Sequence, residues 1–163
     1  MRILGIDPGS RFTGFGIIEV KGDRAECVTH GVIKTGGGEF PQRLGIIFSC
    51  LQDLIRDHRP DQAAIESVFI NRNPGSALKL GQARGAAMCA AIAHGLPVFE
   101  YSPRSVKQAV VGRGNAEKAQ VNHMVAVLLQ MHGDIGEDAA DALAVALCHQ
   151  HTQQTMNRMQ EKK

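Results

Sequence analysis

The chain has 163 residues, of which 44% are hydrophobic and 21% charged, and its formal net charge is +2. These values are ordinary for a globular domain, and the length suits a single domain with a real core. No apolar run approaches the roughly 20 residues that cross a bilayer, and the start lacks the basic and apolar segments of a signal peptide. We therefore expect a cytoplasmic protein with no membrane contact.

The first predicted element is a strand over residues 3–7 that ends in an aspartate. Its alternation places Asp7 on the same face as Ile3 and Gly5, and a Pro-Gly turn follows. A carboxylate at the end of a buried strand costs free energy unless a cation meets it. Asp7 is therefore either a cap for the backbone amides of the turn or a metal ligand.

Two further strands are predicted at residues 13–20 and 25–34, joined by the hairpin signal Gly22-Asp23. Short turns between three strands indicate an antiparallel meander. Apolar residues over 40–58 then follow helical spacing, which ends before Pro60 and indicates an amphipathic helix packed on a sheet.

A short buried strand at residues 63–66 also ends in a carboxylate. Because a helix precedes it, this strand can lie parallel to the first one through a right-handed crossover. Glu66 would then lie near Asp7 at one edge of the sheet. The alternative is a solvated glutamate at the end of a strand.

The next helix, predicted from residue 76 to 94, carries a stripe of small residues. Ala77, Gly81, Gly85 and Cys89 recur every four residues, and each mid-helix glycine costs roughly 1 kcal/mol relative to alanine. Close approach of another backbone would offset that cost. The other backbone belongs either to the sheet of this chain or to the same helix of a second subunit across a two-fold axis.

The rest of the chain alternates between helices and short connections. We predict a strand from residue 97, a short helix from 102 and a glycine-containing linker from 112. An amphipathic helix from 117 and a terminal helix from 138 follow. The terminal helix is expected to end near His149. Residues 1–150 would then form the single domain, and 151–163 a polar, flexible tail.

Two more acids lie at the start of the terminal helix. Asp138 and Asp141 are three residues apart and share a helix face, although Asp138 could simply cap the helix. Asp141 is surrounded by alanines, which are small enough to bring the helix close to a sheet. Four converging carboxylates would repel one another, and oxygen-only donors favour Mg²⁺ or Mn²⁺. Two such ions about 4 Å apart can clamp both reacting oxygens of a phosphodiester.

These motifs, taken together, resemble a known family. The order of elements is similar to the ribonuclease H-like fold, an α/β fold with a five-stranded mixed sheet flanked by helices. Several stretches resemble the RuvC family of bacterial Holliday-junction resolvases, in matching order and spacing over roughly residues 3–150. They are Gly5-Ile6-Asp7-Pro8-Gly9-Ser10-Arg11, Ile65-Glu66 with Phe69, and residues 76–85, 114–118 and 138–142.

The resemblance implies that Asp7, Glu66, Asp138 and Asp141 are catalytic ligands of two metal ions. Some members have a histidine in the last acidic pair, where this chain has two aspartates. It also implies a homodimer that nicks two opposed strands of a four-way DNA junction during recombination and repair. Each nick would leave a 5′-phosphate and a 3′-hydroxyl. Cooperation with the RuvA–RuvB branch-migration complex and a preference for T-rich cleavage sequences follow from the resemblance alone.

The charge balance supports a DNA substrate independently. Without the four acids, 12 acidic residues remain against 18 lysines and arginines, a balance of +6 available for phosphates. The candidate contacts around the linker are Arg104, Lys107, Arg113 and Lys118. A cation in the first helical turn, such as Lys118, opposes the helix dipole and suggests a bound phosphate, unless it is only a solvated lysine. Lys107 resembles a family position near the scissile phosphate.

The loop after Glu66 contains two further DNA-binding candidates, Phe69 and Arg72. An aromatic residue three positions past a catalytic acid is well placed to stack on an unpaired base at the crossover. Core packing under the loop is the alternative for Phe69, because phenylalanine is often buried.

Two other functional classes compete with this hypothesis. Residues 7–14 also resemble the first phosphate loop of actin-like sugar kinases, but those enzymes enclose ATP between two such domains. The chain also lacks the P-loop motif GxxxxGK[ST]. A junction-binding protein without catalysis is the other class, and it would gain nothing from four clustered negative charges facing DNA.

Overall fold

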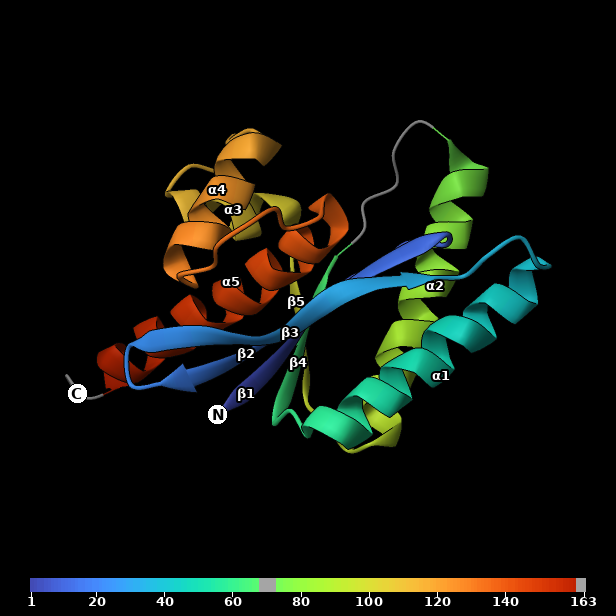
Figure 1. Ribbon diagram of the computed structural model, residues 1–163, viewed down its shortest axis with the longest axis horizontal. Helices are drawn as coiled ribbons and strands as arrows, with labels where there is room; N and C mark the ends of the chain where they lie inside the picture. Colours follow the sequence, from blue (N-terminus) through green and yellow to red (C-terminus); the bar gives the residue numbers. More distant parts are fainter. Residues whose placement is uncertain (68–72, 161–163) are drawn as a thin grey trace.

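A five-stranded mixed sheet forms the centre of the computed structural model, which describes residues 1–67 and 73–160 (Figure 1). The strand order is β3-β2-β1-β4-β5. The first three strands form the predicted antiparallel meander, and β1, β4 and β5 run parallel. The predicted sheet and crossover are confirmed. The strands are β1 (Arg2–Asp7), β2 (Phe12–Lys21), β3 (Arg24–Lys34), β4 (Gln62–Glu66) and β5 (Val98–Tyr101).

Helices cover both faces of the sheet. In Figure 1, α1 and α2 lie on one side, and α5 lies on the other with α3 and α4 packed beyond it. Among the described helices, none is long and apolar enough to span a bilayer. The helices are α1 (Phe40–His58), α2 (Pro74–Ala93), α3 (Pro103–Val111), α4 (Lys118–Leu128) and α5 (Glu137–Gln160).

The terminal helix is longer than the sequence pattern predicted. The expected end near His149 is wrong, because α5 continues to Gln160. No glycine or proline interrupts this stretch, and the hydroxyls of Thr152 and Thr155 bond to carbonyls one turn earlier. The change to polar residues therefore marks where the helix leaves the core, and residues 151–160 of the predicted tail are helical.

The alternation of β1 divides the core into two halves. Ile3 packs with the α5 side, whereas Leu4 and Ile6 pack with α1 and α2, and all three are essentially buried. This is the two-faced pattern expected of a strand covered by helices on both sides. Asp7, which follows Ile3 and Gly5 on this face, is thereby directed toward the side of the sheet that α5 covers.

Glycines in β1 and β2 allow α5 to lie unusually close to the sheet. A Cβ atom on Gly5 would overlap the carbonyl oxygen of Ala142, and one on Gly14 would overlap that of Asp138. Gly14 is also the ladder partner of Asp7. The backbone of the first turn of α5 is therefore in contact with the strand pair that carries Asp7.

The substitution Gly14→Ala should destabilise the protein by about 1–3 kcal/mol, because the new methyl group must displace the backbone of Asp138. Urea unfolding followed by circular dichroism measures the effect. Gly45→Ala is the matched control: Gly45 lies in α1 with open space around it, so alanine should stabilise the helix by up to about 1 kcal/mol. Equal unfolding midpoints for Gly14→Ala and wild type would contradict the close contact.

Candidate active site

Three acids from different elements converge at one edge of the sheet. The parallel register of β1 and β4 places Asp7 beside Glu66, as predicted, and Asp141 reaches the same place from α5. All three line a pocket of about 250 Å³. Side chains separated by up to 134 residues in sequence therefore share one cavity, which is the arrangement expected of a catalytic site.

The fourth predicted acid, Asp138, lies at the margin of this cluster. It is in the first turn of α5, one turn before Asp141, and it does not line the pocket. Its charge is nevertheless close enough to raise the pKa of Asp7. The structure therefore brings Asp138 near the other acids, at a greater distance from the pocket than Asp141.

Burial and mutual repulsion make these carboxylates hard to ionise. The pKa of Asp7 is raised to about 7, mainly by burial and then by Glu66, Asp141 and Asp138. Burial likewise raises the pKa of Glu66 and of Asp141. The charge of Lys118 opposes all three shifts. A nearby positive charge makes it easier for these acids to ionise, and this is the electrostatic character of a cation-binding site.

Lys118 is the cation that balances the cluster in this structure. It begins α4, as predicted, and its Nζ donates to Glu137 Oε1 at 2.7 Å and to Asp141 Oδ2 at 3.2 Å. The hydrogen bond with Glu137 is the main reason that the pKa of Lys118 is raised. Lys118 is therefore hydrogen-bonded to the acidic cluster, and it is more than a solvated surface lysine.

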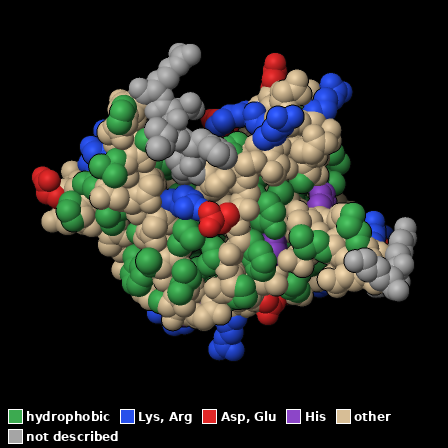
Figure 2. Space-filling model, turned by 180° about the vertical axis from the view of Figure 1, so that it is seen from behind, with side chains coloured by type: hydrophobic (Ala, Val, Ile, Leu, Met, Phe, Trp, Pro, Cys, Tyr) green, Lys and Arg blue, Asp and Glu red, His purple; other side chains and the backbone are tan. Residues whose placement is uncertain are grey.

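The other predicted basic residues differ in their distance from the acids. Lys107, on α3, lines the same pocket as Asp7 and Glu66. Arg104 and Arg113 are exposed outside it, and the side chain of Arg104 packs against Gly114. Figure 2 shows lysine and arginine side chains gathered along the upper edge of the molecule on this face. Two further predicted contacts, Phe69 and Arg72, lie outside the described residues.

Arg84 is a contact of the site that the sequence analysis did not identify. Its Nε donates to the backbone carbonyl of Glu66 at 3.2 Å, and its guanidinium also pairs with Glu100 of β5. Immediately after Glu66, both the amide and the hydroxyl of Ser67 donate to the carbonyl of Tyr101. The end of β4 is therefore held from two sides. No periodicity connects Arg84 with Glu66, so only the assembled fold reveals the contact.

The small-residue stripe of α2 faces away from the sheet. A Cβ atom on Gly81 or Gly85 would meet no described atom within 4 Å, and Cys89 is exposed while Ala77 is half-buried. The buried face of α2 instead consists of Ala83, Ala87, Ala90 and Ala91. The alternative in which the stripe packs on this chain's own sheet is therefore wrong.

The donor set of the acidic cluster suits a hard divalent cation. All the acids offer oxygen, the ligand that Mg²⁺ and Mn²⁺ prefer. Among the described residues, no group of three or more potential ligands is already arranged to hold a metal ion.

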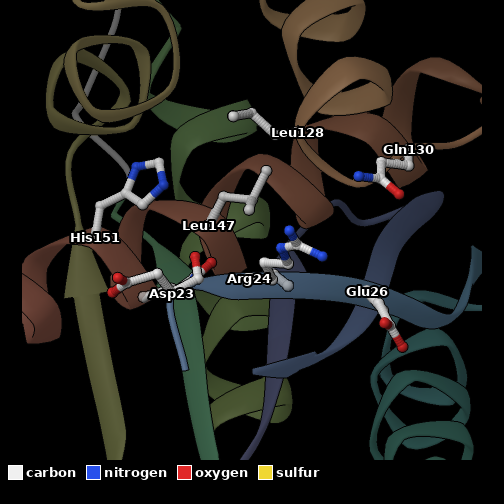
Figure 3. Close-up of a pocket in the computed structure, with 9 residues that line it drawn as sticks. Asp23, Arg24, Glu26, Leu128, Gln130, Leu147 and His151 are labelled. Carbon is white, nitrogen blue, oxygen red and sulfur yellow. The ribbon is translucent and has the colours of Figure 1, made fainter. Parts of the chain in front are cut away.

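A second pocket, of about 160 Å³, lies near the tip of the β2–β3 hairpin and is shown in Figure 3. Asp23, Arg24 and Glu26 of the hairpin line it together with Leu147 and His151 of α5. None of the predicted site residues lines this pocket. Its acidic and basic side chains alternate along the hairpin, so it offers no convergent acidic cluster.

Ionisation of the buried Asp7 carboxyl should make the metal-free protein lose stability as the pH rises. The unfolded carboxyl ionises near pH 4 and the folded one near pH 7, so the contribution of Asp7 is complete below about pH 4 and is lost as the pH rises through about 7. Asp7→Asn removes this penalty. In EDTA, its melting temperature should increasingly exceed that of wild type between about pH 5 and about pH 8. A constant difference across this range would contradict the raised pKa.

Comparison with known proteins identifies the relatives of this chain. The family described as "Crossover junction endodeoxyribonuclease RuvC" matches residues 3–149. The protein of that name from Burkholderia thailandensis is 57% identical over 159 residues, covering 98% of this chain and 88% of the relative.

Solved structures agree with the sequence matches. Thermus thermophilus RuvC in complex with a Holliday junction substrate is similar with a TM-score of 0.90 and 36% identity, covering 96% of each chain. The yeast mitochondrial Holliday junction resolvase Ydc2 shares the fold, with a TM-score of 0.72 and 14% identity over 96% of this chain and 80% of the other. The match over nearly the whole length, together with the acids converging at the sheet edge, shows that this chain belongs to the RuvC family of crossover junction endodeoxyribonucleases.

Proposed function

We propose that this chain resolves four-way DNA junctions by nicking two opposed strands in a divalent-metal-dependent reaction. The observation that carries the proposal is the convergence of Asp7, Glu66 and Asp141 in one pocket, in a chain of the RuvC family. Resolution of junctions places the enzyme in recombination and DNA repair, on chromosomal DNA in the bacterial cytoplasm.

The acids are proposed to hold two Mg²⁺ ions, for which Mn²⁺ can substitute. Ions held there would supply the chemistry that activates a water and stabilises the departing 3′ oxygen. Asp7 and Glu66 would provide ligands from the strand ends, and Asp138 and Asp141 from α5. Ionisation of these carboxylates is required for this role, and the cation that they bind compensates for the burial and repulsion that raise the pKa of Asp7.

The basic residues near the acids are proposed to position the DNA strand. Lys107 and Lys118 line the pocket with Asp7 and Glu66, so their ammonium groups can contact the scissile phosphate. Arg104 and Arg113, exposed on α3 and the turn after it, suit phosphates farther along the strand. In the loop after β4, Arg72 is proposed to contact the backbone, and Phe69 to stack on a base at the crossover.

The exposed face of α2 is proposed to form a homodimer interface. Ala77, Gly81, Gly85 and Cys89 allow close approach of a second helix. Elsewhere on α2, the large apolar side chains of Leu78 and Ile92 are 66% and 58% exposed. A two-fold dimer would present two active sites to the two symmetric strands of a junction. The RuvA–RuvB complex is the proposed partner in branch migration.

The test of the proposed chemistry is the substitution Asp7→Asn. Loss of one carboxylate should lower the single-turnover rate of cleavage of a synthetic four-way junction in Mg²⁺ by roughly 100-fold or more. Junction affinity should be kept or improved, because a charge that repels phosphate is gone. Asp23→Asn, at the hairpin tip, controls for the same loss of charge.

Each competing class predicts a different result in this assay. Near wild-type cleavage by Asp7→Asn would refute the catalytic assignment. A junction-binding protein would bind the DNA and leave it intact in every variant. A kinase-like protein would hydrolyse ATP, so ATPase activity is measured in parallel and is expected to be absent.

The dimer interface predicts the behaviour of Gly81→Leu. Filling the stripe should yield a folded monomer in sedimentation velocity that binds junctions poorly, because one site of the pair is missing. Gly45→Leu, on the exposed side of α1 with open space around it, is the matched control and should remain dimeric. A Gly81→Leu protein that is still a tight dimer would show that α2 does not form the interface.

A further inference from the structure

A groove at the end of the sheet combines an exposed aromatic ring with three cations. It lies where β2 begins, β3 ends and the chain passes to α1, at the right-hand end of the sheet in Figure 1. Arg11 and Phe12 line it from the start of β2, Lys34 from the end of β3, and Arg43 from α1. The volume of this open groove is about 430 Å³, and Phe12 is 50% exposed.

The cations of this groove are not neutralised by neighbouring acids. None of the residues that line it is acidic, and within residues 1–67 and 73–160 no salt bridge involves Arg11, Lys34 or Arg43. The one side-chain hydrogen bond of Arg43 in this part of the chain goes from Nε to the carbonyl of Gly38. A positive surface with an exposed apolar ring at its centre fits a ligand that carries anionic and apolar parts in alternation.

The backbone that carries these side chains is firmly held. The buried Thr35 donates from its hydroxyl to the carbonyl of Ser10 at 2.9 Å and from its amide to the carbonyl of Arg11 at 3.1 Å. Phe12 and Lys34 are direct partners in the β2–β3 ladder. The spacing of Arg11, Phe12 and Lys34 is thus fixed before any ligand arrives, and pre-formed geometry lowers the entropic cost of binding.

The groove lies close to the catalytic edge. Gly14 is the ladder partner of Asp7, and Phe12 is two residues before it, about 7 Å along the strand. Because this separation is short, one bound DNA strand can reach both the acids and the groove within a few nucleotides. Its residues come from β2, β3 and α1, whereas Lys107 and Lys118 come from α3 and α4.

We propose that this groove binds the sugar–phosphate backbone of the strand being cut, within a few nucleotides of the scissile phosphate. Arg11, Lys34 and Arg43 contact phosphates, and Phe12 packs on a deoxyribose between them. The inference rests on the proposed function, since it takes junction DNA as the substrate. It adds a second, independent contact to the strand, so that the scissile phosphate is held between two basic surfaces.

The test compares two double variants that each remove two positive charges. Arg11→Ala with Lys34→Ala alters the groove, and Lys21→Ala with Arg24→Ala alters the other end of the same hairpin, where these two residues are ladder partners. Affinity for a synthetic four-way junction is measured in EDTA at several salt concentrations. The groove variant should bind about ten-fold more weakly, and its slope of log K against log salt should fall by about 2. The control should match wild type in both.

Further measurements separate the possible occupants. Phe12→Leu should keep junction affinity and Phe12→Ala should lose it, because packing on a deoxyribose needs only an apolar surface. If both variants lose the same affinity, the ring stacks on a base and the proposed backbone contact is wrong. If the groove double variant has the same junction affinity and salt slope as the control, the proposal is refuted. A protein partner would then be the occupant of this surface. If wild type neither binds nor cuts the junction, the proposed function itself fails. Melting temperatures confirm that each variant is folded.

Discussion

The contact between α5 and the glycines of β1 and β2 determines where the acidic residues can meet. Because Gly5 and Gly14 have no side chains, the backbone of α5 lies directly on the strand pair, with Ala142 and Asp138 at the points of contact. A helix is normally held farther from a sheet by the side chains of both. Here the smaller separation brings Asp141 to the strand end that carries Asp7, so the packing of the core and the geometry of the site have the same cause.

This convergence stores electrostatic repulsion that the fold must tolerate. Burial raises the pKa of Asp7, Glu66 and Asp141, and repulsion from neighbouring carboxylates raises each of them further. In this structure Lys118 offsets part of that repulsion from α4, and its second partner, Glu137, is exposed and outside the pocket. Lys118 can therefore leave Asp141 for a phosphate and still keep one carboxylate partner. This clustering of buried acids lowers stability, which is common where a protein keeps residues for a function.

Local rules predicted the parts of the site that depend on local geometry. Two buried strands that end in acids, separated by a helix, are enough to place Asp7 beside Glu66, because parallel strands end at the same edge. The contacts of long side chains could not be predicted in this way. Arg84 reaches Glu66 across 18 residues of sequence, and the partners of Lys118 depend on how α4 packs on α5.

The end of α5 was mispredicted because a loss of apolar periodicity signals exposure, whereas only the hydrogen bonds decide whether the helix continues. The close packing of α5 has a trace in the sequence. Gly14 and Gly16 are two positions apart and therefore lie on the same face of β2, and two glycines on one face indicate a closely packed neighbour.

Helix α2 connects the proposed subunit interface with the catalytic edge through one side chain. Its alanine face packs on the sheet and its glycine face is open. Arg84, adjacent to Gly85, extends from this helix to the carbonyl of Glu66 and to Glu100. A shift of α2 along its axis would therefore alter the support of the strand end that carries Glu66. A second subunit packed on the glycine face would restrict such shifts, because backbones in close contact leave little room for sliding. Dimerisation would then do more than supply a second active site: each subunit would stiffen the support of Glu66 in the other subunit.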